Sequence, residues 1–387
     1  MNPFVFSNPT KLIFGKGQLS RLAKEVSRYG RRVLFVYGGG SIKKNGIYEQ
    51  VMEELKKMDA VIFEFGGVEP NPRLTTVHKG VQICKENDIE FILAVGGGSV
   101  IDAAKAIAAG AKYDGDVWDI IIRKARPKEA IPFGIVLTHA ATGSEVNGSS
   151  VITHWELKQK VGWGSLLTFP KFSILDPSFT ATVPKEQTVY GIIDMMCHVL
   201  ETYFDRAENV PLQERFCESL LVTMIETAPK LINDLTNYEY RETIMFCGSM
   251  ARYGTTRMGM YGDWATHEIE HVLSALYDIP HAGGLAILYP QWLKFTADID
   301  PTKHVKLAKN VFGIDTAGKT EKEVAYEMID KLKQFWQELG APAKLSHYGI
   351  DDAKFDVIAE MACANGELGT YVKLKKKDVL TILQMAK

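Results

Sequence analysis

The sequence predicts an α/β domain over residues 1–183 followed by an all-helical domain over residues 184–387. Three observations support this prediction. Short apolar, β-rich segments alternate with amphipathic segments through the first domain, two of the apolar segments end in the same Gly-Gly-Gly-Ser sequence, and only helical periodicity remains after about residue 184. Such alternation is typical of a parallel sheet that helices cover on both faces.

The elements of the first domain follow one another in a regular order. The expected strands lie within residues 31–41, 60–68, 90–99, 131–145 and 172–177. The expected helices lie at residues 46–58, 76–89 and 100–111. Because the apolar strands are nearly continuous, they are expected to be buried on both faces, which indicates a Rossmann-like sheet.

In the second domain, apolar residues recur three and four positions apart, as on the buried face of a helix. The clearest helical segments are residues 189–204, 214–232, 242–259 and 323–339. No repeat or low-complexity linker separates the domains, so the expected boundary, near Val183 and Pro184, rests on the change of periodicity.

Composition narrows the class of function. A formal net charge of −2 over 387 residues, without a basic run, argues against nucleic-acid binding. No apolar run approaches the roughly 18 residues that span a bilayer, and the N-terminal residues lack a secretory signal pattern. Five scattered cysteines without a CxxC pair fit a reducing compartment. We therefore expect a cytoplasmic protein that binds neither nucleic acid nor membrane.

The second glycine loop and the polar loop after a later strand predict a nucleotide site. Glycines between a strand and a helix let the backbone approach a pyrophosphate, although the spacing is not GxGxxG and a plain tight turn is the alternative. Asp102, one turn into the helix, is expected either to complement the helix dipole or to reach a ligand amide. The candidate residues are Gly96, Gly97, Gly98, Ser99, Asp102, Thr138 and Thr142.

The first glycine loop bears on the choice of nucleotide. An acidic residue at the end of such a strand would bind a ribose 2′-hydroxyl and repel a 2′-phosphate. Here the strand end carries no acid, and a hydroxyl and two cations follow, although the lysines alternatively form a solvated helix start. This pattern predicts NADP(H), with NAD(H) as the alternative. The residues concerned are Gly38, Gly39, Ser41, Lys43 and Lys44.

A set of histidines and one carboxylate predicts a metal site. Asp194 and His198 are four residues apart, on one face of an expected helix, although such a pair alone is more often a surface contact. His267 lies early in another expected helix, and His281 lies where the next helix should start. Three imidazoles and one carboxylate suit a reactive divalent ion such as Fe(II) or Zn(II).

Taken together, these motifs resemble the iron-containing alcohol dehydrogenase family, in its branch of NADP-dependent butanol dehydrogenases and broad-range aldehyde reductases. The resemblance extends over essentially the whole chain and includes NPTKLIFGKG, AVGGGSVIDAAKAIA, DMMCHVLE and LSALYDIPHAGGLAIL. It implies the architecture that this family shares with dehydroquinate synthase, a homodimer, and one catalytic divalent metal. The implied metal ligands are Asp194, His198, His267 and His281.

The resemblance also implies roles for three further residues. His271 would lie near nicotinamide and substrate and either shape the pocket or relay a proton, with a plain helix-surface histidine as the alternative. Asn147 and Lys160 would lie beside the cofactor. The implied reaction is reversible hydride transfer between NADPH and small linear aldehydes such as butanal, with the metal polarising the aldehyde oxygen. A lyase of the dehydroquinate-synthase type and a non-enzymatic NADP-binding sensor are the alternatives. The lyase would need a cluster of cations that residues 185–285 lack.

Overall fold

The computed structural model describes all of residues 1–387, which form two compact units. The helical unit comprises Met1–Phe6, Pro184–Asn233 and Gly254–Lys387, and the α/β unit comprises Ser7–Val183 and Asp234–Tyr253. The predicted domains differ from these units in two segments. The first six residues group with the helical unit, and Asp234–Tyr253 groups with the α/β unit, because tertiary contacts rather than chain order decide the grouping.

The α/β unit contains a six-stranded sheet with the order β1-β8-β5-β4-β2-β3, and every neighbouring pair is parallel. Its strands are β1 (Lys11–Phe14), β2 (Arg32–Tyr37), β3 (Val61–Phe65), β4 (Phe91–Gly96), β5 (Phe133–Leu137) and β8 (Phe172–Leu175). The chain runs from β2 to β3 at one edge and then returns to β4 on the other side of β2. The carboxyl ends of β2 and β4 therefore flank the topological switch point, where open α/β sheets bind ligands.

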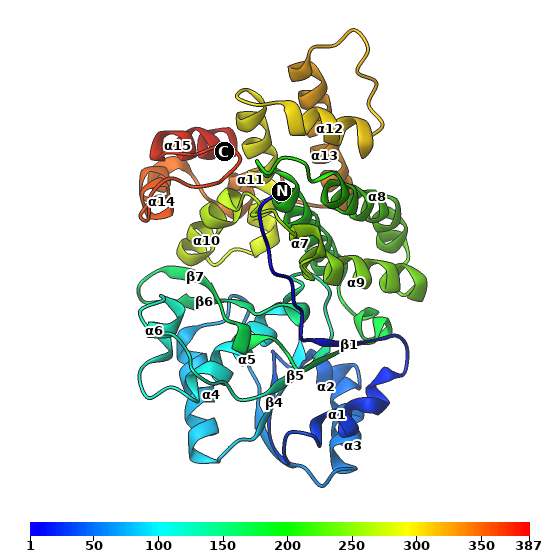
Figure 1. Cartoon of the computed structure of the whole chain (residues 1–387), viewed down its shortest axis with the longest axis vertical. Helices are drawn as coiled ribbons and strands as arrows, with labels where there is room; N and C mark the ends of the chain where they lie inside the picture. The colour runs from blue at the N-terminus through cyan, green and yellow to red at the C-terminus, as the bar shows by residue number, and fades with distance from the viewer. The chain divides into compact units, whose positions relative to one another are not determined.

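Helices cover both faces of this sheet, as the continuous apolar strands predict (Figure 1). One apolar core joins the sheet to α4 (Leu74–Glu86), α5 (Gly98–Gly110) and α6 (Val117–Ile121). The other core joins it to α1 (Leu22–Val26), α2 (Ser41–Lys44) and α3 (Ile47–Lys56). The predicted architecture, an α/β N-terminal part with a parallel sheet and a helical C-terminal part, is confirmed.

An antiparallel hairpin of β6 (Ser149–His154) and β7 (Gln159–Gly164) was not predicted from the sequence. Its strands mix glycine, lysine and tryptophan with few aliphatic residues, so the period-two pattern of a half-buried strand is weak. Thr153 of β6 bridges to Arg73, just before α4, and α5 packs against β6. The hairpin thereby joins the face of the sheet that α4 and α5 cover.

The helical unit contains no strand, in agreement with the purely helical periodicity after residue 184. Its helices are α7 (Lys185–Tyr203), α8 (Pro211–Asn233), α10 (Ala265–Tyr277), α11 (His281–Ala297), α12 (Thr302–Asn310), α13 (Glu321–Leu339), α14 (Phe355–Ala362) and α15 (Lys376–Met385). α11 contacts α7, α10, α13 and α15 and forms the centre of this unit. Neither unit contains a helix that is both long and apolar enough to cross a bilayer.

Helix α9 (Tyr238–Arg252) follows α8 in the chain but belongs to the α/β unit. The ring of Phe246 packs edge-on against Phe14 of β1, with 5.5 Å between ring centroids. Ser249 donates a 2.6 Å hydrogen bond to the buried carboxylate of Glu145. These contacts make α9 part of the sheet's support.

Candidate functional site

Helix α7 carries the first two predicted metal ligands inside the helical unit. Residues 191–203 are all buried, as in a helix that neighbours surround on every side. Asp194 and His198, four residues apart, project from one face of this helix and are only 3% and 6% exposed. Buried polar groups of this kind are stable only with partners, so their neighbours are informative.

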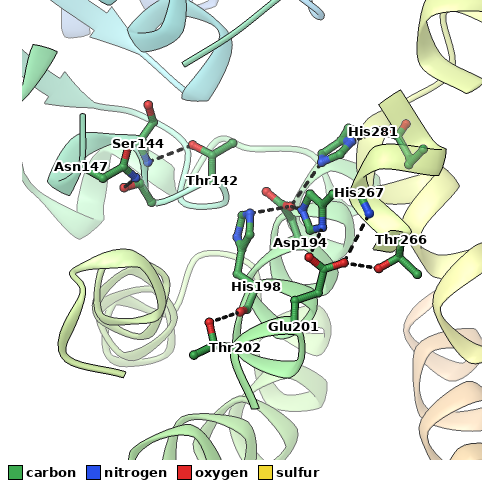
Figure 2. Close-up of polar contacts among 12 residues, drawn as sticks. Thr142, Ser144, Asn147, Asp194, His198, Glu201, Thr202, Thr266, His267 and His281 are labelled. Carbon is green, nitrogen blue, oxygen red and sulfur yellow. Dashed lines mark hydrogen bonds and ion pairs between the residues drawn. The ribbon is translucent and has the colours of Figure 1, made fainter. Parts of the chain in front are cut away.

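The turn between α10 and α11 brings the other two predicted ligands, His267 and His281, close to Asp194. Asp278 ends α10 in the left-handed region, with a φ of 54°, and Pro280 then precedes the first residue of α11, His281. The Nε2 atoms of His198, His267 and His281 lie 3.6, 4.0 and 3.8 Å from Asp194 Oδ1. Figure 2 shows the three rings converging on this carboxylate.

This arrangement fits one divalent metal ion. Asp194 Oδ1 is buried and has no hydrogen-bond donor, although three imidazole nitrogens surround it. The separations are too long for hydrogen bonds, but ligand atoms that each lie about 2.0–2.2 Å from a shared ion have separations of this order. A cation among these atoms would remove the cost of the unsatisfied buried carboxylate. The structure therefore brings together all four predicted metal-ligating residues.

Two buried glutamates contact the rings of two predicted metal ligands, and neither glutamate was predicted from the sequence. His267 Nδ1 lies 3.0 Å from Glu201 Oε2, and Glu201 also accepts a hydrogen bond from the Thr266 hydroxyl. His281 Nδ1 is paired in the same way with Glu270. A carboxylate at Nδ1 keeps the proton there and leaves Nε2 free to bind a metal.

A sequence signal for these glutamates exists in retrospect. Each follows a predicted metal ligand by three residues on the same helix, Glu201 after His198 and Glu270 after His267. The spacing does not reveal the pairing, because neither glutamate contacts the histidine that it follows. Glu201 contacts His267, and Glu270 contacts His281. Only the packing of α7, α10 and α11 shows which ring each glutamate holds.

His271 lies one turn after His267 on α10, beside the metal centre. Its ring centroid is 6.3 Å from that of His267 and 5.6 Å from that of His281. Ligand atoms of His271, Glu270 and His281 lie within 4.8 Å of one another, but His271 is not in the group that contains Asp194. This position fits a residue that neighbours the ion without binding it, and its catalytic role stays a prediction.

The two glycine loops of the α/β unit follow the strands that flank the switch point. Residues 38–41 follow β2, and residues 96–99 begin at the last residue of β4. A Cβ added to Gly98 would lie 2.4 Å from Thr142 Cγ2, so the loop after β5 packs directly against the loop after β4. Thr138 N donates to Gly96 O at 3.1 Å, which joins the same two loops. The structure thus gathers these predicted nucleotide-binding residues at one end of the sheet.

Two predicted nucleotide-binding side chains support the protein's own loops. The Asp102 carboxylate accepts hydrogen bonds from Ser144 Oγ at 2.7 Å and from Val151 N at 2.9 Å. The structure thus shows Asp102 in contact with the loop after β5, and its expected roles toward the helix dipole or a ligand amide stay predictions. The Asn147 amide donates to Gly143 O at 2.8 Å and accepts from Ser149 N at 2.8 Å. Both residues shape the loop after β5.

Lys105, which the sequence reasoning did not select, is the centre of this loop support. Its ammonium group is fully buried and donates 2.7 Å hydrogen bonds to Ser144 O, Ser144 Oγ and Ser149 O. Burial lowers the pKa of Lys105 to about 7, opposed by the nearby Asp102 and Glu145 carboxylates. Lys160 lies on β7, close enough for its charge to act on Asp102.

The first glycine loop has an acidic neighbour that the sequence did not reveal. Lys43 on α2 forms an ion pair with Glu64 of β3, with 3.2 Å between Nζ and Oε2. Ser41 and Lys44, also on α2, are exposed. β2 does not end in an acidic residue. The neighbouring strand β3 instead supplies the carboxylate of Glu64, which contacts Lys43, a residue predicted to favour a 2′-phosphate.

A parallel α/β unit with glycine loops at its switch point, in one chain with a buried nitrogen and oxygen donor set, defines a metal-dependent, nucleotide-using enzyme. Comparison of the sequence with models of known protein families gives the same class of enzyme. Residues 9–177 match the model described as iron-containing alcohol dehydrogenase, and residues 188–387 match its C-terminal counterpart. The chain belongs to the iron-containing alcohol dehydrogenase family. It is an oxidoreductase with a nicotinamide cofactor and a metal.

Individual relatives are similar over nearly the whole chain. A protein of Bacillus subtilis named probable NADH-dependent butanol dehydrogenase 1 is 61% identical over 99% of both chains. The NADPH-dependent aldehyde reductase YqhD of Escherichia coli is 38% identical over 92% of both. The crystal structure of NADH-dependent butanol dehydrogenase A from Thermotoga maritima matches with a TM-score of 0.96 and 42% identity, covering 100% of this chain and 99% of the other.

Proposed function

We propose that this protein catalyses reversible hydride transfer between a reduced nicotinamide nucleotide and small linear aldehydes such as butanal. The observation that carries the proposal is the convergence of three imidazole Nε2 atoms within 4.0 Å of Asp194 Oδ1. The names of the Bacillus and Thermotoga relatives, both butanol dehydrogenases, support the choice of a short alcohol and aldehyde. Nothing in these comparisons supports the lyase or the sensor.

In this proposal the bound metal supplies a Lewis acid for the aldehyde oxygen, and the nicotinamide supplies the hydride. Asp194, His198, His267 and His281 would hold the metal, and the buried glutamates would fix the orientation of two of the rings. The glycine loops after β2 and β4 would hold the nucleotide. The position of His271 beside His281 supports its role in passing a proton to the product oxygen.

For the nucleotide we propose NADH as the preferred form. The sequence pattern alone predicted NADP(H), because two lysines follow the first glycine loop and no acid ends its strand. That argument did not include Glu64, which pairs with Lys43. The name of the Bacillus relative supports NADH, whereas that of the Escherichia coli relative supports NADPH. A homodimer, which the resemblance implies, also stays a proposal.

The test is butanal reduction by anaerobically purified protein, with and without Fe(II) or Zn(II), using NADH and NADPH in parallel. We expect metal-dependent turnover that is faster with NADH. Asp194→Asn should abolish turnover and metal binding, whereas Asp330→Asn, an exposed aspartate on α13 of the same unit, should change neither. The absence of turnover with either metal, in folded protein that binds nucleotide, would overturn the proposed function.

A further inference from the structure

Four side chains from four elements of the α/β unit meet beside the first glycine loop. The Glu64 carboxylate of β3 accepts hydrogen bonds from Tyr37 Oη at 3.0 Å and Tyr48 Oη at 2.5 Å, and pairs with Lys43 Nζ at 3.2 Å. The same ammonium group lies 4.9 Å and 4.5 Å from the ring centroids of Tyr37 and Tyr48. We call these four residues the Glu64 cluster.

The Glu64 cluster borders the first glycine loop, the region that contacts the adenosine ribose of a dinucleotide in Rossmann-like folds. Tyr37 is the last residue of β2, and Glu64 is in register with Phe35 two residues earlier, so the two side chains share a face of the sheet. Gly67 N donates to Gly38 O at 3.0 Å, which holds the segment after β3 against the glycine loop. A Cβ added to Gly39 or Gly40 would meet nothing within 4 Å, so the loop borders open space.

The charges in the Glu64 cluster compensate one another. The Tyr48 hydrogen bond and the Lys43 ion pair lower the pKa of Glu64, while the Tyr37 and Glu64 contacts raise the pKa of Lys43. Both groups are therefore charged at neutral pH. A phosphate that approached Lys43 would also approach a carboxylate, whereas a ribose hydroxyl could donate a hydrogen bond to that carboxylate.

We propose that Glu64 is a specificity-determining residue that disfavours a 2′-phosphate and thereby selects NAD(H) over NADP(H). The acid that usually ends the ribose-binding strand comes here from the neighbouring strand. The two tyrosine hydroxyls hold the carboxylate in place, and Lys43 is neutralised rather than available for phosphate. This inference rests on the proposed function, because it assumes that a nicotinamide nucleotide binds at these loops.

Binding of two small probes tests the proposal without metal, aldehyde or turnover. Calorimetry on the full chain would compare 5′-AMP with adenosine 2′,5′-bisphosphate, which differ only in the 2′-phosphate. We expect the wild type to favour 5′-AMP. Glu64→Gln should raise the affinity ratio of bisphosphate to 5′-AMP roughly tenfold at low salt, and the gain should shrink at high salt.

Two matched variants make the result specific. Glu53→Gln removes an equal charge from an exposed position on α3 and should leave the ratio unchanged. Adding Lys43→Met to Glu64→Gln should abolish the gain, because the lysine freed by the first change is then absent. A ratio that Glu64→Gln changes less than threefold, while both probes bind, would overturn the inference and leave the proposed function intact. If neither probe bound to the wild type or to any variant, the inference and the proposed function would both be refuted.

Discussion

Replacement of Glu270 by glutamine should weaken metal binding without unfolding the protein. Glu270 is fully buried, and its carboxylate is bonded to His281 Nδ1 and to the Ser274 hydroxyl. The amide has nearly the same shape, but it accepts a hydrogen bond as a neutral group. The variant therefore changes the charge behind the ring of His281 while keeping its packing.

The magnitude follows from the kind of hydrogen bond that is lost. Bonds to charged groups contribute about 1.5–3 kcal/mol, and bonds between neutral groups contribute about 0.5–1.5 kcal/mol. A difference of about 1.4 kcal/mol corresponds to a factor of ten in a dissociation constant. We therefore expect the Kd for Zn(II) to rise roughly tenfold, the lower end of the range typical for groups that orient metal ligands.

The assay is competition for Zn(II) between apoprotein and a chromogenic chelator. Glu268→Gln, the same change at an exposed position two residues earlier on α10, is the matched control and should leave the Kd unchanged. Circular dichroism would show that both variants fold. A Glu270→Gln protein that folds and binds Zn(II) within twofold of the wild type would refute the view that this carboxylate orients His281.

Three further predictions concern His271, Gly98 and His304. His271→Gln should lower kcat for butanal reduction about a hundredfold and leave the Zn(II) Kd within twofold, and a parallel loss of metal affinity would contradict its assignment to proton transfer. Gly98→Ala should weaken NADH binding, measured by fluorescence titration, because its Cβ would lie 2.4 Å from Thr142 Cγ2; Thr142→Ala in the same chain should restore part of the affinity. Burial lowers the pKa of His304 to about 4. Since this lies below the unfolded value of about 6.5, its contribution is complete above pH 6.5 and up to about 3 kcal/mol is lost as the pH falls to 4. Urea unfolding of His304→Gln over that range should show a correspondingly weaker pH dependence, and an unchanged dependence would contradict this origin.

The sequence predicts the sheet and the proximity of Asp194 and His198 because both depend on local patterns. A continuous apolar strand such as residues 91–96 requires burial on both faces, and the spacing of Asp194 and His198 places them on one helical face. The β6–β7 hairpin was missed because its residues lack a clear alternation. The membership of α9 depends on contacts with residues more than a hundred positions away, such as that between Ser249 and Glu145.

The residues that sequence reasoning missed share one property, since each acts on a side chain from another element. Glu201 on α7 holds a ring from α10, and Glu64 on β3 holds a lysine from α2. Lys105 on α5 supports the loop after β5. Periodicity describes which face of one element is buried, but the pairing of two elements depends on how they pack, so these contacts required the structure.

The membership of α9 in the α/β unit also affects the order in which the chain can fold during synthesis. All strands of the sheet have been made once Val183 is added, but Ser249, which bonds the buried Glu145 carboxylate, comes later. At about 5–20 residues per second, the ribosome needs on the order of 4–14 s to add residues 184–253. During this interval the carboxylate lacks its hydroxyl donor and Phe14 lacks the ring of Phe246. Nascent chains that stall before α9 should therefore be better substrates for chaperones and proteases than chains that stall after it.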